Sequence, residues 1–148
     1  MPRIAALIVL VLAGCSADSG LSLDSLEAES ILSADIPGLS NDRVTDRQDG
    51  SGPMITQLSD VAGSWEAASV EIANAVRQHG WTVDSINCVR TGNDVIAKKQ
   101  VEGQWVLLES GAGTRGAGII LRLAPTQQAP GSVDIDSRCS AALIAAVS

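Results

Sequence analysis

Residues 57–80 read QLSDVAGSWEAASVEIANAVRQHG, and their apolar side chains recur at steps of three or four residues. Such spacing is typical of one face of an α-helix. Thr56 or Ser59 can serve as the N-cap, and Gly80 is a natural stop because glycine tolerates the left-handed conformation that ends many helices. The sequence therefore predicts an amphipathic helix over about residues 57–79. Its apolar face is formed by Leu58, Val61, Trp65, Ala68, Ile72 and Val76.

The chain after this helix is rich in β-forming residues separated by turn residues. The alternation slips at Asp84-Ser85, which predicts a β-bulge. Residues 91–94 are typical of a turn, and Glu102-Gly103 fits a two-residue hairpin loop. Short hairpin connections favour antiparallel pairing, so we expect a sheet of four to five antiparallel strands. The strand-like runs are residues 81–89, 95–101, 104–109, 119–123 and 133–135.

The C-terminal residues 138–147 are rich in alanine and predict a short helix, with Cys139 and Leu143 on one face. Together these segments predict an α+β fold, in which the helix over about 57–79 packs on the antiparallel sheet. Residues 54–148 are expected to form this fold as a single domain.

The composition limits the functions that the chain can perform. It has 148 residues, 45% of them apolar and 18% charged, with a net charge of −7, no Phe or Tyr, three Trp and one His. An acidic chain of this kind is not a basic nucleic-acid binder, a multi-span membrane protein or a disulfide-dense miniprotein. The single His and the three Cys leave few groups for catalysis or metal binding.

The N-terminus carries a targeting signal. Residues 4–12 read IAALIVLVL, an apolar run of nine residues, whereas a membrane-spanning helix needs about 20. A run of this length is typical of the core of a signal peptide. It ends in the tetrapeptide Leu12-Ala13-Gly14-Cys15, which resembles the lipobox of bacterial lipoproteins.

The lipobox resemblance implies a processing route and a location. In such lipoproteins the Cys thiol receives a diacylglyceryl group and signal peptidase II cuts before the Cys, so residues 1–14 would be removed and Cys15 would be the anchor. Two or more acyl chains hold a protein stably on a membrane. We therefore expect an exported protein on the extracytoplasmic face of the cell membrane, or on the outer membrane in a diderm host. The alternative is that Cys15 is an ordinary small residue near a generic cleavage site.

The order of the elements also resembles small exported lipoproteins of high-GC Gram-positive (actinobacterial) bacteria. The likeness covers residues 57–123, with a helix that ends in His79-Gly80-Trp81, a strand that contains a Cys, and hairpins. The bias toward Ala, Gly, Val, Asp and Arg suits such genomes. This resemblance implies no activity and no site residue.

Cys88 and Cys139 form an even pair once Cys15 is lipidated. An exported protein folds in an oxidising compartment, so we expect a disulfide between Cys88 and Cys139. Their separation of 51 residues corresponds to about 4 kcal/mol of stability in the chain-entropy model. The alternative is a pair of buried free thiols.

Residues 15–53 are expected to form an acidic tether. From residue 16 to residue 53 the chain carries eight acidic and two basic side chains and no aromatic residue, a composition typical of solvated, flexible segments. A flexible segment of about 40 residues would reach roughly 35 Å from the membrane. One part is expected to be ordered, because residues 23–36 can form a short helix capped by Ser22 or Asp24.

Gly111, Gly113 and Gly116 match the dinucleotide-binding pattern G-x-G-x-x-G. That site needs a helix directly after the loop, but residues 118–123 (GIILRL) favour a strand. A hairpin loop is the better interpretation, since glycines permit positive φ. His79 is interpreted as a residue that complements the dipole at the end of a helix, because it has no Ser or Cys near it in the sequence and one His cannot build a metal site.

Asp42, Asp46 and Asp49 suggest a calcium loop, but EF-hand spacing would place Arg47 and Thr56 at ligand positions. We therefore expect no metal and no cofactor. Carboxylates for acid–base catalysis are available, although no spacing supports them, and the three tryptophans are expected to fill the core. The carboxylates are Glu66, Glu71, Asp84 and Glu109, and the tryptophans are Trp65, Trp81 and Trp105.

These observations favour a membrane-anchored envelope lipoprotein that acts as a non-enzymatic binding or accessory module. The first alternative is a small envelope hydrolase that uses carboxylates or an isolated Ser. The second is a carrier of a lipid or another apolar ligand, held between helix and sheet. The expected partners are the membrane, through Cys15, and an envelope protein or ligand; no nucleic acid is expected.

Overall fold

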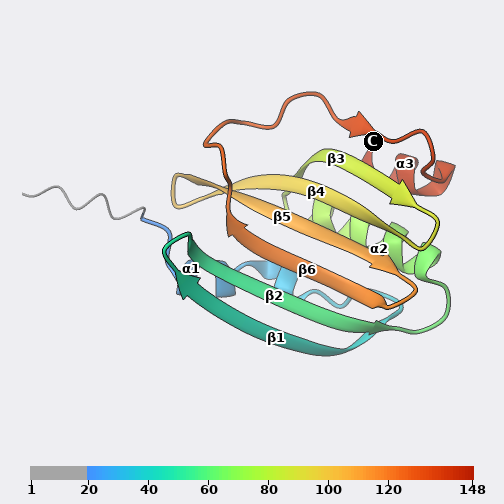
Figure 1. Cartoon of the computed structure of the whole chain (residues 1–148), viewed down its shortest axis with the longest axis horizontal. Helices are drawn as coiled ribbons and strands as arrows, with labels where there is room; N and C mark the ends of the chain where they lie inside the picture. The colour runs from blue at the N-terminus through green and yellow to red at the C-terminus, as the bar shows by residue number, and fades with distance from the viewer. Residues whose placement is uncertain (1–19) are drawn as a thin grey trace, which may run out of the picture.

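A computed structural model describes residues 20–148 of the chain. The described part contains short helices at both ends, one long helix and a large sheet (Figure 1). In chain order the elements are α1 (Leu23–Glu27), the 3₁₀ helix η1 (Ser30–Ser33), β1 (Leu39–Asp49), β2 (Gly52–Val61), α2 (Trp65–Gln78), β3 (Thr82–Val89), β4 (Gly92–Val101), β5 (Gln104–Gly113), β6 (Gly116–Leu123), β7 (Asp134–Ile135) and α3 (Ala141–Val147).

The strands form one seven-stranded sheet in the order β1-β2-β6-β5-β4-β3-β7. Neighbouring strands are antiparallel except β3 and β7, which run parallel. The long helix α2 lies across one face of the sheet, and α3 packs against α2 (Figure 1). The predicted α+β class is confirmed, with seven strands rather than four to five.

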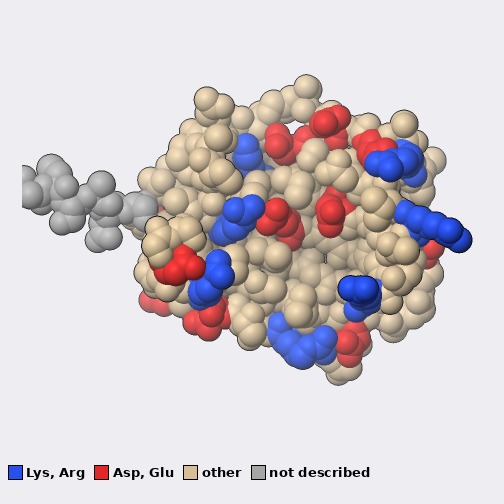
Figure 2. Space-filling model, in the orientation of Figure 1, with Lys and Arg blue, Asp and Glu red and all other residues tan. Residues whose placement is uncertain are grey.

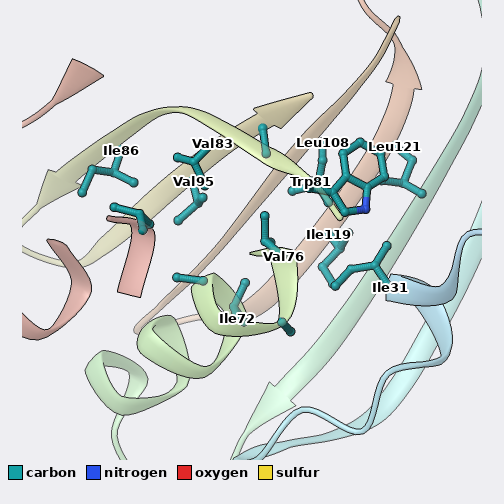
Figure 3. Packing of buried hydrophobic residues seen from close by; sticks show 14 of the residues in the cluster. Ile31, Ile72, Val76, Trp81, Val83, Ile86, Val95, Leu108, Ile119 and Leu121 are labelled. Atoms are coloured by element: carbon teal, nitrogen blue, oxygen red, sulfur yellow. The ribbon is translucent and has the colours of Figure 1, made fainter. Parts of the chain in front are cut away.

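The core lies between α2 and the sheet (Figure 3). Ile72 and Val76 of α2 and Val95 and Leu108 of the sheet are fully buried there. Burying an aliphatic side chain of this size stabilises the fold by about 1.5–3 kcal/mol. Trp81, which is 3% exposed, adds the largest side chain to this layer.

The main helix begins later in the chain than the spacing predicts. The preceding residues form β2, and α2 begins at Trp65 after the N-cap Ser64. Gly63 turns the chain between the two elements with a φ of +87°. The predicted start of the helix near residue 57 is wrong, because Leu58 and Val61 continue the helical spacing of apolar residues by coincidence. Their backbone instead belongs to a strand that pairs with β1 on one side and β6 on the other.

Residues 20–53, which the sequence predicts as a flexible tether, are part of the fold. β1 is an edge strand of 11 residues that pairs with β2, and nearly all of its side chains are exposed. Charged side chains on an edge strand protect it against pairing with other chains. The prediction is wrong here because such a strand has the polar composition of a linker.

The segment before β1 packs against the domain. Leu26 of α1 and Ile31 of η1 are fully buried, and Leu21 and Ile36 are each 5% exposed. The helix expected over residues 23–36 is present in part: α1 ends at Glu27 and has Ser22 as its cap, and the separate 3₁₀ helix η1 follows it. These contacts attach the start of the described chain to the hydrophobic core.

Several local predictions are confirmed. The register of β3 against β4 shifts between Val83 and Ser85, where the sequence predicts a bulge. Glu102 and Gly103 form the turn between β4 and β5, and both have positive φ. Gly80 follows the end of α2 with a φ of +81°, as expected of a residue that ends a helix.

The C-terminal residues close the other edge of the sheet. β7 pairs with β3 over two residues, and a disulfide joins Cys88 of β3 to Cys139, whose Cα atoms lie 5.2 Å apart. Ser140 then caps α3, which packs on α2. The predicted disulfide and the predicted short C-terminal helix are confirmed.

Candidate functional site

The candidate site is a small cavity where the first turns of α2, the β3–β4 hairpin and the segment before α3 meet. Figure 1 shows these elements at the end of the molecule opposite to the start of the described chain. The cavity has a volume of about 210 Å³, below the range of about 300–1,000 Å³ that is typical of drug-sized ligands. Its lining includes Trp65, Ser69, Cys88, Asn93, Arg138 and Leu143.

Asn93 is one of two buried polar residues in the lining, with 6% of its surface exposed; the other is Ser69, at 2%. Its Oδ1 accepts hydrogen bonds from Ser69 Oγ at 2.5 Å and from the backbone amide of Ala112 at 3.3 Å. The Ala112 amide fixes the orientation of the side chain, because only the oxygen can accept from it. Its Nδ2 has no hydrogen-bond partner among residues 20–148. An unpaired buried donor costs about 1–3 kcal/mol, and this nitrogen is itself buried beneath the surface of the cavity.

Apolar surfaces make up much of the lining around this donor. Trp65 is half-buried at the start of α2, and Leu143 of α3 is 3% exposed. Cys88 brings the disulfide to the lining and attaches the segment around Arg138 to β3. A mostly apolar lining with a few placed polar groups is typical of small-molecule sites.

Charges of both signs occur at the cavity. Arg138 donates to both carboxylate oxygens of Asp136 at 2.6–3.0 Å. These bonds hold the pKa of Asp136 well below its usual range, and Asp136 raises the pKa of Arg138. Glu66 also lines the cavity and accepts a hydrogen bond from Ser64 Oγ at 2.8 Å. Because Asp136 neutralises Arg138, the remaining charge is the carboxylate of Glu66.

The G-x-G-x-x-G residues lie in the β5–β6 hairpin as predicted, but Gly111 and Gly113 stand in the strand β5 and not in a loop, and of the three glycines Gly116 has the positive φ. A Cβ on Gly111 would overlap the carbonyl oxygen of Asn93, and a Cβ on Gly113 would lie 2.5 Å from the carbonyl oxygen of Thr91. Glycine is therefore required here by the close approach of β4 and β5. The element after the motif is a strand, and the helix that a dinucleotide phosphate needs does not follow it.

His79 caps the end of α2 and contacts the N-terminal segment. Its Nδ1 lies 2.7 Å from Ser30 Oγ, a partner 49 residues away that the sequence does not reveal. Lys99 Nζ donates to Glu29 at 2.7 Å and to the His79 carbonyl oxygen at 3.3 Å. It also lies 5.7 Å from the ring centre of Trp81. These contacts hold η1 against the end of the core.

The acidic residues that suggest a calcium loop are spread along β1. Asp42 accepts hydrogen bonds from Gln57 Nε2 at 2.8 Å and from Ser59 Oγ at 2.6 Å. Asp49 accepts from Ser51, whose hydroxyl and amide hold the pKa of Asp49 below its usual value. Within residues 20–148, no three His, Cys, Asp or Glu side chains are grouped so that they could hold a metal ion.

The face of the sheet opposite to α2 carries charges of both signs, and Figure 2 shows acidic and basic side chains interspersed on it. Glu109 and Arg122 form an ion pair there at 3.1 Å. Of the other carboxylates considered for catalysis, Glu66 and Glu71 belong to α2 and Asp84 belongs to β3. The candidate carboxylates are thus distributed over α2, β3 and β5.

Only one of the three tryptophans fills the core as predicted. Trp81 is 3% exposed, whereas Trp65 and Trp105 are half-buried. Trp65 lines the cavity because α2 begins with it. Trp105 lies in β5, where the side chain of Gln127 bonds to its backbone nitrogen and oxygen.

The lipobox residues Leu12, Ala13, Gly14 and Cys15 lie outside the described residues, so the lipidation of Cys15 stays a prediction. Between residues 20 and 148, the structure has no helix with the length and apolar character needed to span a membrane. No protein-family model, no curated protein and no solved structure matches the chain.

The polar pair of the cavity, Asn93 and Ser69, is not evident from the sequence. Asn93 stands among the residues 91–94 that the sequence predicts as a turn. The register of the β3–β4 hairpin places it opposite Cys88 and buries it. Whether a polar residue such as Asn93 becomes buried depends on which strands pair in the sheet, and this cannot be seen from the spacing of residues along the chain.

Proposed function

We propose that this chain is an exported lipoprotein, anchored through Cys15, whose domain is a non-enzymatic binding module at the cell envelope. The observation that carries the proposal is the disulfide between Cys88 and Cys139. Disulfides persist in oxidising compartments outside the cytoplasm and are rare inside it. The third cysteine is Cys15, at the position where the lipobox pattern expects the lipidated residue.

The position of Leu21 supports a short attachment to the membrane. Leu21 lies six residues after Cys15 and is 5% exposed in the core. Six residues span at most about 20 Å when fully extended, so a lipid on Cys15 would hold the domain at the membrane surface. The expected reach of roughly 35 Å for a flexible tether is therefore replaced by a much shorter attachment.

The candidate cavity lies at the far end of the domain from this attachment. In Figure 1 the described chain begins at the left, whereas α2 begins and α3 lies at the right. The cavity is lined by residues from these last two elements. A ligand would therefore approach from the envelope side and not from the lipid.

Metabolic labelling with an alkyne-tagged fatty acid tests the anchor. We expect the wild-type protein to incorporate the label and Cys15→Ala to lose it, because the thiol is the acyl acceptor. Ser16→Ala, the neighbouring substitution, should be labelled like the wild type. A labelled Cys15→Ala protein, or an unlabelled wild type, would refute the lipid anchor.

The contact between Ser30 and His79 favours a hydrolase as a second candidate function. A Ser hydroxyl at hydrogen-bond distance from an imidazole is the arrangement that activates a nucleophile. A triad also needs a carboxylate on the other ring nitrogen, and residues 20–148 contribute no hydrogen bond of that kind. This candidate predicts ester hydrolysis that is lost in Ser30→Ala. Equal rates for the wild type and the variant would exclude it.

A lipid carrier has less support, because side chains fill the space between helix and sheet (Figure 3). Ile72, Val76, Val95 and Leu108 are all fully buried in that layer. An acyl chain would have to separate these side chains before it could enter, at the cost of their packing.

A further inference from the structure

We propose that the cavity between the β5–β6 turn and the β2–α2 connection binds a sugar acid, a six-membered sugar ring that carries a carboxylate. Trp65 would stack on the ring, and Arg115 would pair with the carboxylate. This sugar acid would be the ligand of the proposed binding module, so the proposal rests on that function but not on the lipid anchor. The cavity adjoins the candidate site, since Trp65 lines both.

The cavity is large enough for a sugar ring and is open to solvent. Its volume of about 410 Å³ lies in the range of about 300–1,000 Å³ that is typical of ligand sites. Asp60, Thr114 and Arg115 of its lining are exposed, and Trp65 is half-buried. Figure 1 shows the β5–β6 turn and the start of α2 at the same end of the molecule. A ligand therefore reaches these side chains without opening the core.

Arg115 supplies a positive charge to the cavity. Its guanidinium forms no ion pair within residues 20–148, whereas Arg43, Arg122 and Arg138 are each held by a carboxylate. A guanidinium without such a partner presents its N–H groups to a ligand, and it binds a carboxylate through two parallel hydrogen bonds. The ligand should therefore carry a carboxylate.

Asp60, the acidic residue of the lining, does not cancel this charge. Its two carboxylate oxygens accept hydrogen bonds from Asn41 Nδ2 at 3.0 Å and from Arg43 at 3.1 Å. These bonds hold the pKa of Asp60 below its usual value, so the carboxylate stays ionised and paired with Arg43. Each oxygen can still accept from a ligand hydroxyl, because a carboxylate has about four acceptor positions.

Trp65 is the aromatic residue of the lining and favours a ring-shaped ligand. The face of an aromatic ring carries negative potential, which attracts the weakly positive C–H groups on the face of a sugar ring. Most of the remaining lining is polar, with the hydroxyl of Thr114 and the backbone of Gly113 and Gly116. These groups suit the hydroxyls at the rim of a sugar, whereas a hydrocarbon ring would leave them without partners.

The β5–β6 turn that carries Arg115 is held in place by its neighbours. The backbone amide of Thr114 donates to the carbonyl oxygen of Thr91 at 3.0 Å. On the other side, a Cβ on Gly116 would lie 2.9 Å from the carbonyl oxygen of Ser59, so the turn also packs closely against β2. A site that is formed before binding loses less conformational entropy when its ligand arrives.

Titration with methyl β-D-glucuronide tests the class of ligand. The nitrogen-15-labelled protein is purified from membranes in a detergent without a sugar headgroup, and the Trp65 indole N–H and Arg115 Nε–H resonances are followed. Methyl β-D-glucoside keeps the ring and hydroxyls but lacks the carboxylate, and cyclohexanecarboxylate keeps the ring and carboxylate but lacks the hydroxyls. We expect the glucuronide to shift both resonances saturably, with an affinity at least about tenfold higher than that of either control. The absence of a saturable shift, or a control that binds as tightly as the glucuronide, would overturn the proposal.

Arg115→Gln removes the positive charge from an exposed turn and keeps N–H donors there. We expect its affinity for the glucuronide to fall at least about tenfold, to the level of the glucoside. Arg90→Gln is the matched control, because Arg90 is also exposed, forms no ion pair in the described part of the chain and lies outside this lining. It should bind the glucuronide as the wild type does. Unchanged affinity in Arg115→Gln, or an equal loss in Arg90→Gln, would overturn the proposal.

Trp65→Ala removes the aromatic surface, and we expect it to bind the glucuronide at least about tenfold more weakly. Trp105→Ala should bind as the wild type does, since Trp105 is equally half-buried but lies in β5 outside the lining. Equal affinities of these two variants would contradict the stacking of the ring on Trp65 and overturn the proposal. If Trp65→Ala fails to fold, the substitution at Arg115 still decides the test.

The sugar site and the proposed function fail separately. Cys15→Ala is expected to bind the glucuronide with the affinity of the wild type, so binding without lipid label would overturn the anchor alone. Hydrolysis of the bound glucuronide to methanol and glucuronate would overturn the non-enzymatic function and leave the site in place. Lipid label without binding would overturn the sugar site alone.

Discussion

Asn93 of β4 and Gly111 of β5 lie in close contact, and each limits which side chain the other position can carry. The carbonyl oxygen of Asn93 occupies the space that a Cβ on Gly111 would need, while the Asn93 side chain bonds to the amide of Ala112, the next residue. The sequence identifies Gly111 as a loop glycine, chosen for its freedom of φ. The structure gives a different reason, because the residue stands in a strand whose neighbour leaves no room for a side chain.

Gly111→Ala should therefore lower the free energy of unfolding by about 1–3 kcal/mol, the usual cost of an added methyl group in a packed region. Urea denaturation of the variant and the wild type measures it. Gly131→Ala is the control, since a Cβ at Gly131 meets no atom within 4 Å. Equal destabilisation by the two substitutions would mean that the strands can separate without cost.

The Asp136 carboxylate makes stability depend on pH. Its bonds to Arg138 hold its pKa in the folded state below the usual value of about 3.9. A carboxyl of this kind stabilises the fold above the unfolded-state pKa and loses that contribution as the pH falls through the folded-state pKa. Asp136→Asn should accordingly be less stable than the wild type at about pH 7, and the difference should shrink below about pH 4.

Thermal unfolding between neutral and acid pH measures this difference. Arg138→Gln, which removes the partner of Asp136, should show the same convergence with the wild type on acidification. A stability difference that stays constant over the whole pH range would contradict this role of the pair.

A helix or strand could be predicted from the sequence where the spacing of its apolar residues matches the face that becomes buried. The second half of α2 has apolar residues at helical steps, and the strands from β3 to β6 are separated by recognisable turns such as Glu102-Gly103. β1 and β2 could not be predicted. β1 is an exposed edge strand. In β2 the buried positions include Gln57 and Ser59, which bond to Asp42, so no apolar alternation marks the strand.

The segment that contains α1 and η1 is attached to the core through buried side chains such as Leu26. Leu26→Ala should lower the free energy of unfolding by about 2–5 kcal/mol, because Leu26 is fully buried. Glu27→Ala, at the exposed neighbouring position of the same helix, should change it by less than about 0.5 kcal/mol. A Leu26→Ala protein as stable as the wild type would restore the interpretation of this segment as a tether.

Residues 20–148 form a sheet with one covered face, and a disulfide joins β3 to the segment before α3. The pairing of Cys88 with Cys139 could be predicted from the cysteine count and the expected compartment. The cavity could not, because it is made by residues of α2, of the β3–β4 hairpin and of the chain around α3. Their proximity results from the topology of the complete fold.

The disulfide should stabilise the domain and shape the cavity. Replacing both Cys88 and Cys139 by Ala should lower the free energy of unfolding by about 2–4 kcal/mol, because a loop of 51 residues regains its freedom in the unfolded chain. Denaturation with and without reductant measures it, and reductant should affect only the wild type. A wild-type midpoint that is insensitive to reductant would contradict this contribution.

Export and anchoring are the central properties proposed for this protein, and the intact mass of the native protein from the membrane fraction tests both at once. We expect a chain that begins at Cys15 and carries acyl groups, and a gain of two hydrogens when Cys88 and Cys139 are reduced. An unmodified Cys15 thiol, or a chain that retains residues 1–14, would contradict the anchor. A mass that does not change on reduction would contradict the bridge and, with it, the oxidising compartment.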